Sequence, residues 1–87
     1  MQLQLINGQF SPQEALDILT KMTYVKVNYH EQQINASDTA EDIKSREKRI
    51  KDLQRNLQEA RNAIAQSGQQ RVSLQADIIL TIGPAQP

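Results

Sequence analysis

The stretch IKSREKRIKDLQRNLQEARNAI, residues 43–64, decides the fold of this 87-residue chain. It carries a heptad repeat, whose first set of apolar positions holds Ile43, Ile50, Leu57 and Ile64. The second set holds Leu53 and Ala60, with Arg46 as its one polar member. Such a repeat is typical of a helix that packs lengthwise against another helix. We therefore expect a long helix here, with one apolar seam buried against a neighbouring helix.

The two ends of this helix carry their own signals. The polar cluster Asn-Ala-Ser-Asp-Thr at 35–39 indicates a turn, and Asp38 followed by Glu41 is typical of a helix start. Gly68 follows the last heptad, where a left-handed glycine commonly ends a helix. The sequence therefore predicts a helix over residues 38–67.

A first helix is predicted over residues 12–35. Ser11 and Glu14 have the spacing of a capping box, and Pro12 stands at the first helical position. Apolar residues continue at helical spacing in two adjacent stripes, which no glycine or proline interrupts. The first stripe contains Ala15, Ile18, Leu19, Met22, Val25 and Tyr29, and the second contains Leu16, Thr23, Val27, His30 and Ile34. With the second helix, this one would form an antiparallel hairpin.

Residues 23–30 leave an alternative open. The segment Thr-Tyr-Val-Lys-Val-Asn-Tyr-His alternates in polarity and is rich in β-branched and aromatic residues, a pattern typical of a strand. A strand here would convert the fold into βαβαβ with a three-stranded sheet. We favour the helix, because the apolar spacing of three and four continues through the segment to Ile34.

Short strands are expected on both sides of the hairpin. Leu3 and Leu5 alternate with glutamines over residues 2–6, and residues 72–82 alternate similarly apart from Ile79. Because a helical hairpin returns the chain to its starting end, the two strands can pair antiparallel. The expected fold class is mainly α: a coiled-coil-like two-helix hairpin flanked by two short strands (βααβ). It forms a single domain over residues 1–82, with a flexible tail at 83–87.

The composition favours self-association. Aromatic residues are only 3 % of the chain and cysteine is absent, so the core is thin and no disulfide supports it. Small domains of this kind often gain burial by forming oligomers, and a second subunit could pair with an open strand edge. We expect a homo-oligomer, a dimer or higher, or else association with another protein. The expected interaction residues are Ile43, Ile50, Leu53, Leu57, Ile64, Ile78 and Leu80.

The sequence shows no set of residues suited to catalysis. His30 is the only histidine, and on a helix Glu31 points about 100° away from it, which disfavours a shared metal or general-base role. Asp38, Glu41 and Asp42 fall in the first turn of a helix, where the helix dipole stabilises negative charge. The three glycines form no phosphate-binding loop. We therefore expect no enzymatic activity, no metal and no cofactor.

The termini give no membrane signal. The first eight residues lack a basic segment followed by an apolar stretch, and the apolar run at 78–80 is too short to span a bilayer. We expect a cytoplasmic protein without a membrane partner.

Charge is balanced overall but unevenly distributed. Residues 1–43 carry six acidic and two basic side chains, whereas residues 44–61 carry seven basic and three acidic ones. The favoured interpretation is that an acidic helix lies beside a basic one, within a subunit or across a dimer. The alternative is a polyanion site, because one exposed row of the second helix could follow a phosphate backbone. That row contains Lys44, Lys48, Lys51 and Arg55.

Three short motifs support a resemblance. Glu-Ala at 14–15, Lys-Val-Asn-Tyr-His-Glu at 26–31 and Glu-Lys-Arg-Ile-Lys-Asp-Leu at 47–53 lie between the two strand segments. In this the chain resembles a group of small uncharacterised bacterial proteins, and the resemblance implies a helix around Tyr29 and His30. The function we expect is a non-enzymatic module that self-associates through the hairpin and strand edges. A nucleic-acid-binding hairpin is the alternative.

Overall fold

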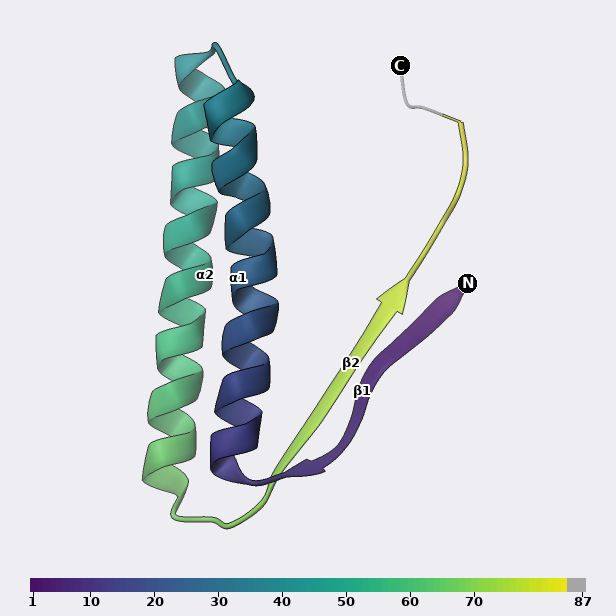
Figure 1. Cartoon of the computed structure of the whole chain (residues 1–87), viewed down its shortest axis with the longest axis vertical. Coiled ribbons are helices and arrows are strands. Elements are labelled where there is room, and N and C mark those ends of the chain that lie inside the picture. The colour runs from purple at the N-terminus through teal and green to yellow at the C-terminus, as the bar shows by residue number, and fades with distance from the viewer. Residues whose placement is uncertain (85–87) are drawn as a thin grey trace.

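A computed structural model describes residues 1–84 as a strand, two helices and a second strand. The elements are β1 (Gln2–Phe10), α1 (Pro12–Ala36), α2 (Ala40–Ser67) and β2 (Val72–Ile79) (Figure 1). This arrangement confirms the predicted βααβ class with a two-stranded antiparallel sheet. Part of the expected tail, residues 85–87, lies outside the described residues.

Helix α1 begins at the predicted capping box. The backbone N–H of Glu14 donates to the Ser11 hydroxyl at 3.1 Å, and the Glu14 carboxylate accepts from the backbone N–H of Ser11 at 3.0 Å. Two otherwise unpaired backbone donors are thereby satisfied. The helix then runs without a break to Ala36, so the alternative strand at 23–30 is wrong. Val27 and His30, three residues apart, are both buried, which agrees with helical spacing.

Helix α2 starts later than predicted and ends where predicted. Its N-cap is Thr39 and not Asp38, and the Thr39 side chain makes no capping hydrogen bond. Instead, the Ser37 hydroxyl accepts from the backbone N–H of Thr39 at 3.3 Å and closes the turn. At the other end Gly68 adopts a left-handed conformation with a φ of 65°, which glycine accommodates without strain.

The two helices lie antiparallel and side by side (Figure 1). The seam between them contains Val27, His30 and Leu57, which are buried, and Ala15 in the first turns of α1 is buried as well. Arg61 of α2 also donates to the Thr20 hydroxyl of α1 at 3.3 Å. The other heptad residues, Ile43, Ile50, Leu53 and Ile64, are half-buried. The core is therefore a single line of side chains between two helices.

The strands pair over a longer part of β1 than predicted and a shorter part of β2. Pairing runs from Phe10 opposite Val72 to Gln2 opposite Ile79, and the backbones of Met1 and Leu80 add a reciprocal pair of hydrogen bonds at 2.7 and 2.8 Å. No described residue pairs with the chain beyond Leu80, which explains why β2 stops short of residue 82.

A β-bulge at Leu5 decides which side chains share a sheet face. Between Gln4 and Ile6 the register shifts by one residue, so that Leu3 and not Gln4 stands opposite Ile78. Opposed residues of an antiparallel pair point to the same face. Without the bulge the glutamines would join this face, and with it the face stays apolar along its length. Its members are Leu3, Ile6, Gly8, Phe10, Val72, Leu74, Ala76 and Ile78.

The sheet diverges from the helices as it leaves the base of the hairpin, which gives the molecule the outline of a V (Figure 1). The Cα extents are 47 × 30 × 14 Å, so the molecule is thin in its third dimension. The radius of gyration is 16.1 Å, whereas a compact domain of this length would have about 12 Å. Domains usually enclose a core between two packed layers, and here the arms of the V are packed only at its base.

Candidate interaction surface

Helix α1 carries two apolar stripes, and only one of them packs against α2. The stripe with Val27 and His30 forms the seam. The other stripe is buried or half-buried at Ala15, Ile18 and Leu19. From Met22 onward it faces the open side of the V and remains exposed: Met22 to 37 %, Val25 to 72 % and Tyr29 to 49 %. Side chains of this size gain free energy when they leave water, so the second stripe is available for a further contact.

The sheet supplies the facing wall of the same opening. Leu5, at the bulge, and Ile78, opposite Leu3, are about half exposed on the side of α1. Together with the second stripe of α1 they form a groove of about 550 Å³. Its lining residues are Leu5, Met22, Val25, Lys26, Tyr29 and Ile78. We call this the apolar groove. A contiguous exposed apolar surface of this kind commonly marks an interaction site.

Both outer edges of the sheet are open over residues 1–84. Strand β1 pairs only with β2, and β2 pairs only with β1. Each outer edge therefore presents unpaired backbone N–H and C=O groups, to which another strand can be added. Two strands alone are marginal in water, and here they rest on the helices only near their base.

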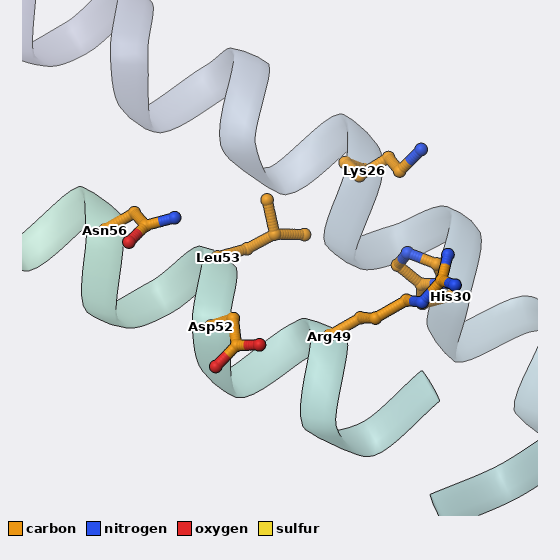
Figure 2. A pocket seen from close by; sticks show the side chains of 6 residues that line it. All are labelled: Lys26, His30, Arg49, Asp52, Leu53 and Asn56. Carbon is orange, nitrogen blue, oxygen red and sulfur yellow. The ribbon is translucent and has the colours of Figure 1, made fainter. Parts of the chain in front are cut away.

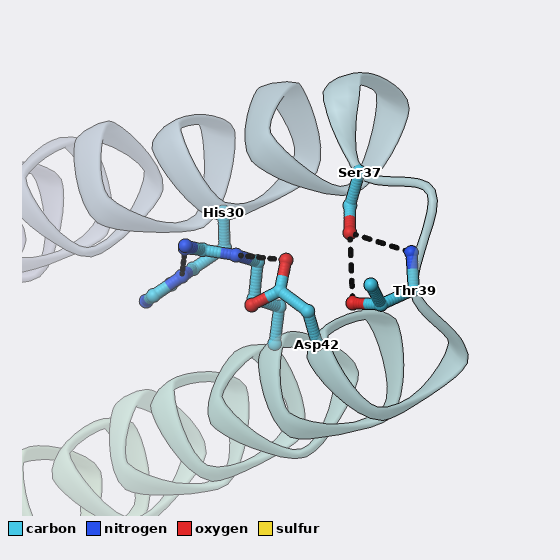
Figure 3. Close-up of polar contacts among 5 residues, drawn as sticks. His30, Ser37, Thr39 and Asp42 are labelled. Atoms are coloured by element: carbon cyan, nitrogen blue, oxygen red, sulfur yellow. Dashed lines mark hydrogen bonds and ion pairs between the residues drawn. The ribbon is translucent and has the colours of Figure 1, made fainter.

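A polar network lies where α1 and α2 meet near the turn (Figure 3). Arg46 Nη1 lies 3.2 Å from His30 Nδ1, and Arg46 Nε donates to Asp42 Oδ2 at 3.2 Å. The Tyr29 ring stands edge-on to the imidazole, with 5.5 Å between ring centroids. Arg46, the polar member of the heptad, thus links two elements of the hairpin and also lies 5.8 Å from the centre of the Tyr29 ring.

The network shifts the pKa values of its members. Burial, followed by the nearby charges of Lys26, Arg46 and Arg49, lowers the pKa of His30 below its ordinary value of 6.5. The Ser37 hydroxyl and then the Arg46 guanidinium lower the pKa of the Asp42 carboxyl. At neutral pH the imidazole is therefore uncharged and the carboxyl is charged. A charged Asp42 carboxylate and an uncharged His30 imidazole can both accept hydrogen bonds from the Arg46 guanidinium, which contacts both.

The predicted interaction residues divide into two groups. The five from the heptad lie in the hairpin seam, so they hold α1 and α2 together within one chain. Only Ile78 reaches the apolar groove, while Leu80 lies just beyond β2 and is 45 % exposed. We did not predict Leu5, Met22, Val25 or Tyr29 as site residues. The signal for the last three was the double stripe of α1, because a single partner helix covers only one stripe.

The predicted polyanion row is exposed along α2, as its spacing requires. Arg55 of this row is paired with Asp52 at 2.7 Å, while Lys44, Lys48 and Lys51 have no carboxylate within ion-pair distance in the described part of the chain. Of the three ion pairs among residues 1–84, one lies within α1 and two lie within α2, so none joins the two helices inside the subunit. The predicted pairing across a dimer stays a prediction.

The described residues contain no group of three or more histidine or acidic side chains that could hold a metal ion. Over residues 1–84, neither helix combines the length and apolar character needed to cross a bilayer. Comparisons with family models, with curated proteins and with solved structures gave no match to this chain. The resemblance to small bacterial proteins therefore stays a prediction.

Proposed function

We propose that the protein is a non-enzymatic module that self-associates, with a second copy of the chain covering the apolar groove. The observation that carries the proposal is the groove itself, where α1 and the sheet face each other with half-exposed apolar side chains. A second copy that inserts its own α1 or sheet would bury these side chains and supply the missing second layer.

The exposed area is large enough for a stable dimer. The chain exposes 7074 Å², whereas a compact monomer of 9.9 kDa would expose about 5,200 Å². The excess is roughly 1,900 Å², and each partner of a standard-size interface buries only about 800 Å². Burial of even half of this excess by each copy would therefore suffice for a specific homodimer.

Charge complementarity favours a second copy over an unrelated partner. The segment 44–61 has a net charge of +4, the segment 1–43 has −4, and within one subunit no ion pair joins the two helices. In a twofold dimer the two copies present the same surface to each other. If that surface includes both segments, the acidic segment of each copy can meet the basic segment of the other. Each copy also offers an open strand edge for continuation of the sheet.

The test is a charge placed in the groove. Val25→Asp puts a carboxylate on the most exposed apolar residue of the groove, which costs the monomer little and would be buried in the dimer. Light scattering coupled to size-exclusion chromatography should show an oligomer for the wild type and a monomer for Val25→Asp. Gln54→Asp, an equal change on the exposed side of α2, is the matched control and should leave the mass unchanged. Equal masses for all three proteins would refute the groove as the interface.

Nucleic-acid binding is the second candidate, and the three unpaired lysines of α2 favour it. Lys44, Lys48 and Lys51 form a row with no aromatic side chain for base stacking, which suits contacts with phosphates only. Binding to duplex DNA that weakens steeply with salt would support this function. Retention of that binding in a Lys48→Glu/Lys51→Glu variant would exclude the row.

A further inference from the structure

A second cavity, of about 320 Å³, lies between the two helices on the side of the His30 network. Its lining comes from both helices: Lys26 and His30 of α1, and Arg49, Asp52, Leu53 and Asn56 of α2 (Figure 2). In this view the Arg49 side chain reaches from α2 toward His30, and Leu53 points into the space between the helices. We call this the cationic pocket.

The contact with Arg46 fixes the hydrogen on the imidazole. A guanidinium has only donors, so His30 Nδ1, 3.2 Å from Arg46 Nη1, must be the acceptor. The neutral ring then carries its hydrogen on Nε2. Nε2 has no hydrogen-bond partner among residues 1–84, although His30 is only 2 % exposed and lines the pocket. Every fully buried polar side-chain atom of the described residues has a hydrogen-bond partner, so the unpartnered Nε2 must keep some contact with solvent. We infer that it does so at the edge of this pocket, which His30 lines.

The positively charged side chains that line the pocket also lack a negatively charged partner. Asp52 is held by Arg55 at 2.7 Å, and Asp42 is held by Arg46 at 3.2 Å. Lys26 and Arg49 have no carboxylate partner within the described residues. The imidazole cannot take up a proton to act as a third cation without opposing Arg46. The pocket thus presents two free cations and one oriented N–H, and its single carboxylate is already paired.

We propose that the cationic pocket binds a small tetrahedral oxyanion, either free phosphate or the phosphate group of a monoester. Arg49 can donate two parallel hydrogen bonds to phosphate oxygens, and Lys26 supplies the second positive charge. His30 Nε2 donates to a third oxygen, and the Asn56 amide offers a further donor. No Phe, Tyr or Trp side chain lines the pocket, and its one aromatic ring, that of His30, is only 2 % exposed, so it offers no open face for a nucleobase.

His30 provides the probe, because it is the only histidine of the chain. Its imidazole resonances are followed by NMR during addition of inorganic phosphate, with chloride at matched ionic strength as the comparison. Phosphate should shift these resonances to saturation, and chloride should not. Arg49→Gln should weaken binding about ten- to a hundredfold, since a charge-assisted hydrogen bond contributes roughly 1.5–3 kcal/mol. Lys44→Gln removes an exposed cation of α2 that does not line the pocket, and should bind as the wild type does.

A parallel titration with glycerol 3-phosphate separates the two sources: tighter binding of the ester indicates a phosphate monoester, and tighter binding of phosphate indicates the free ion. Circular dichroism confirms that each variant is folded. Lys26 also borders the apolar groove, so Arg49 is the discriminating position. Equal affinity in Arg49→Gln and wild type, or shifts that chloride reproduces, would overturn the proposal.

Discussion

The helical hairpin and the strand hairpin of this chain are built from similar aliphatic residues, yet only the helical one is closed. Val27 is fully buried in the seam between α1 and α2, whereas Ile78 of β2 is 45 % exposed and Ile79 is 80 % exposed. The helices have each other as partners along their whole length. The sheet has a helix near its base and open space beyond it. The helical hairpin therefore buries its apolar seam within one chain, whereas the sheet leaves apolar side chains exposed.

The largest effect on stability should come from the seam. Leu57→Ala removes the most buried heptad residue, which is 6 % exposed, and should lower the free energy of unfolding by roughly 2–4 kcal/mol. Urea denaturation at a fixed protein concentration measures this change in the free energy of unfolding. Gln54→Ala, on the exposed side of the same helix, is the control and should change stability by less than about 0.5 kcal/mol. An equally small effect of Leu57→Ala would mean that the seam is not the core.

A charge in the sheet should act on association and spare the helices. Ile78→Asp places a carboxylate in the wall of the apolar groove. The dissociation constant of the oligomer should rise by about a hundredfold, which corresponds to roughly 2.7 kcal/mol. Far-UV circular dichroism should show the same helix content as the wild type. A variant that loses its helices instead would show that the helical hairpin depends on the sheet.

Loss of the capping box, which lies where β1 joins α1, should have a smaller effect on stability. Ser11→Ala removes the hydroxyl that accepts from the Glu14 backbone, 3.1 Å away, and should lower the free energy of unfolding by about 1 kcal/mol. Thermal melts measure this loss. Ser11→Asp keeps a capping acceptor and should retain most of the wild-type stability. A loss in Ser11→Asp equal to that in Ser11→Ala would show that the cap is not the cause.

Acid should weaken the helical hairpin through His30. Its pKa is lowered in the folded protein, so below 6.5 the unfolded chain takes up the proton first and unfolding becomes more favourable. Stability is therefore full above pH 6.5 and declines as pH falls toward the lowered pKa. His30→Asn offers Arg46 an amide oxygen but does not titrate, so its stability should be flat over this window. The lowered pKa values of Glu14 and Asp42 add a separate loss at pH values below 4.5.

The helical hairpin could be predicted because its signals are local. The Ser11 box, the heptad and Gly68 each depend on residues close in sequence, and the structure places all three as expected. Only the start of α2 was misplaced, because Ser37 closes the turn in place of an Asp38 cap. The α2 side of the seam could also be predicted, since heptad spacing alone groups its residues.

The sheet and the groove were harder to predict because they depend on residues far apart in sequence. Asn7 and Gly8 interrupt the alternation of β1, yet Gly8 pairs with Leu74 and the strand continues to Phe10. The bulge at Leu5 arises from register with β2, and no residue of β1 alone indicates it. The groove requires knowledge of which stripe of α1 faces α2, and that choice is made only when the hairpin packs.

If a second copy covers the groove, the wild-type chain must associate at micromolar concentration, which sedimentation equilibrium measures. A chain whose groove is covered by a second copy should sediment with at least twice the monomer mass of 9.9 kDa. The mass should fall toward that of the monomer on dilution, following a single association constant. A mass of 9.9 kDa throughout, together with a cooperative melt that does not depend on concentration, would show that the chain is a stable monomer with an uncovered groove.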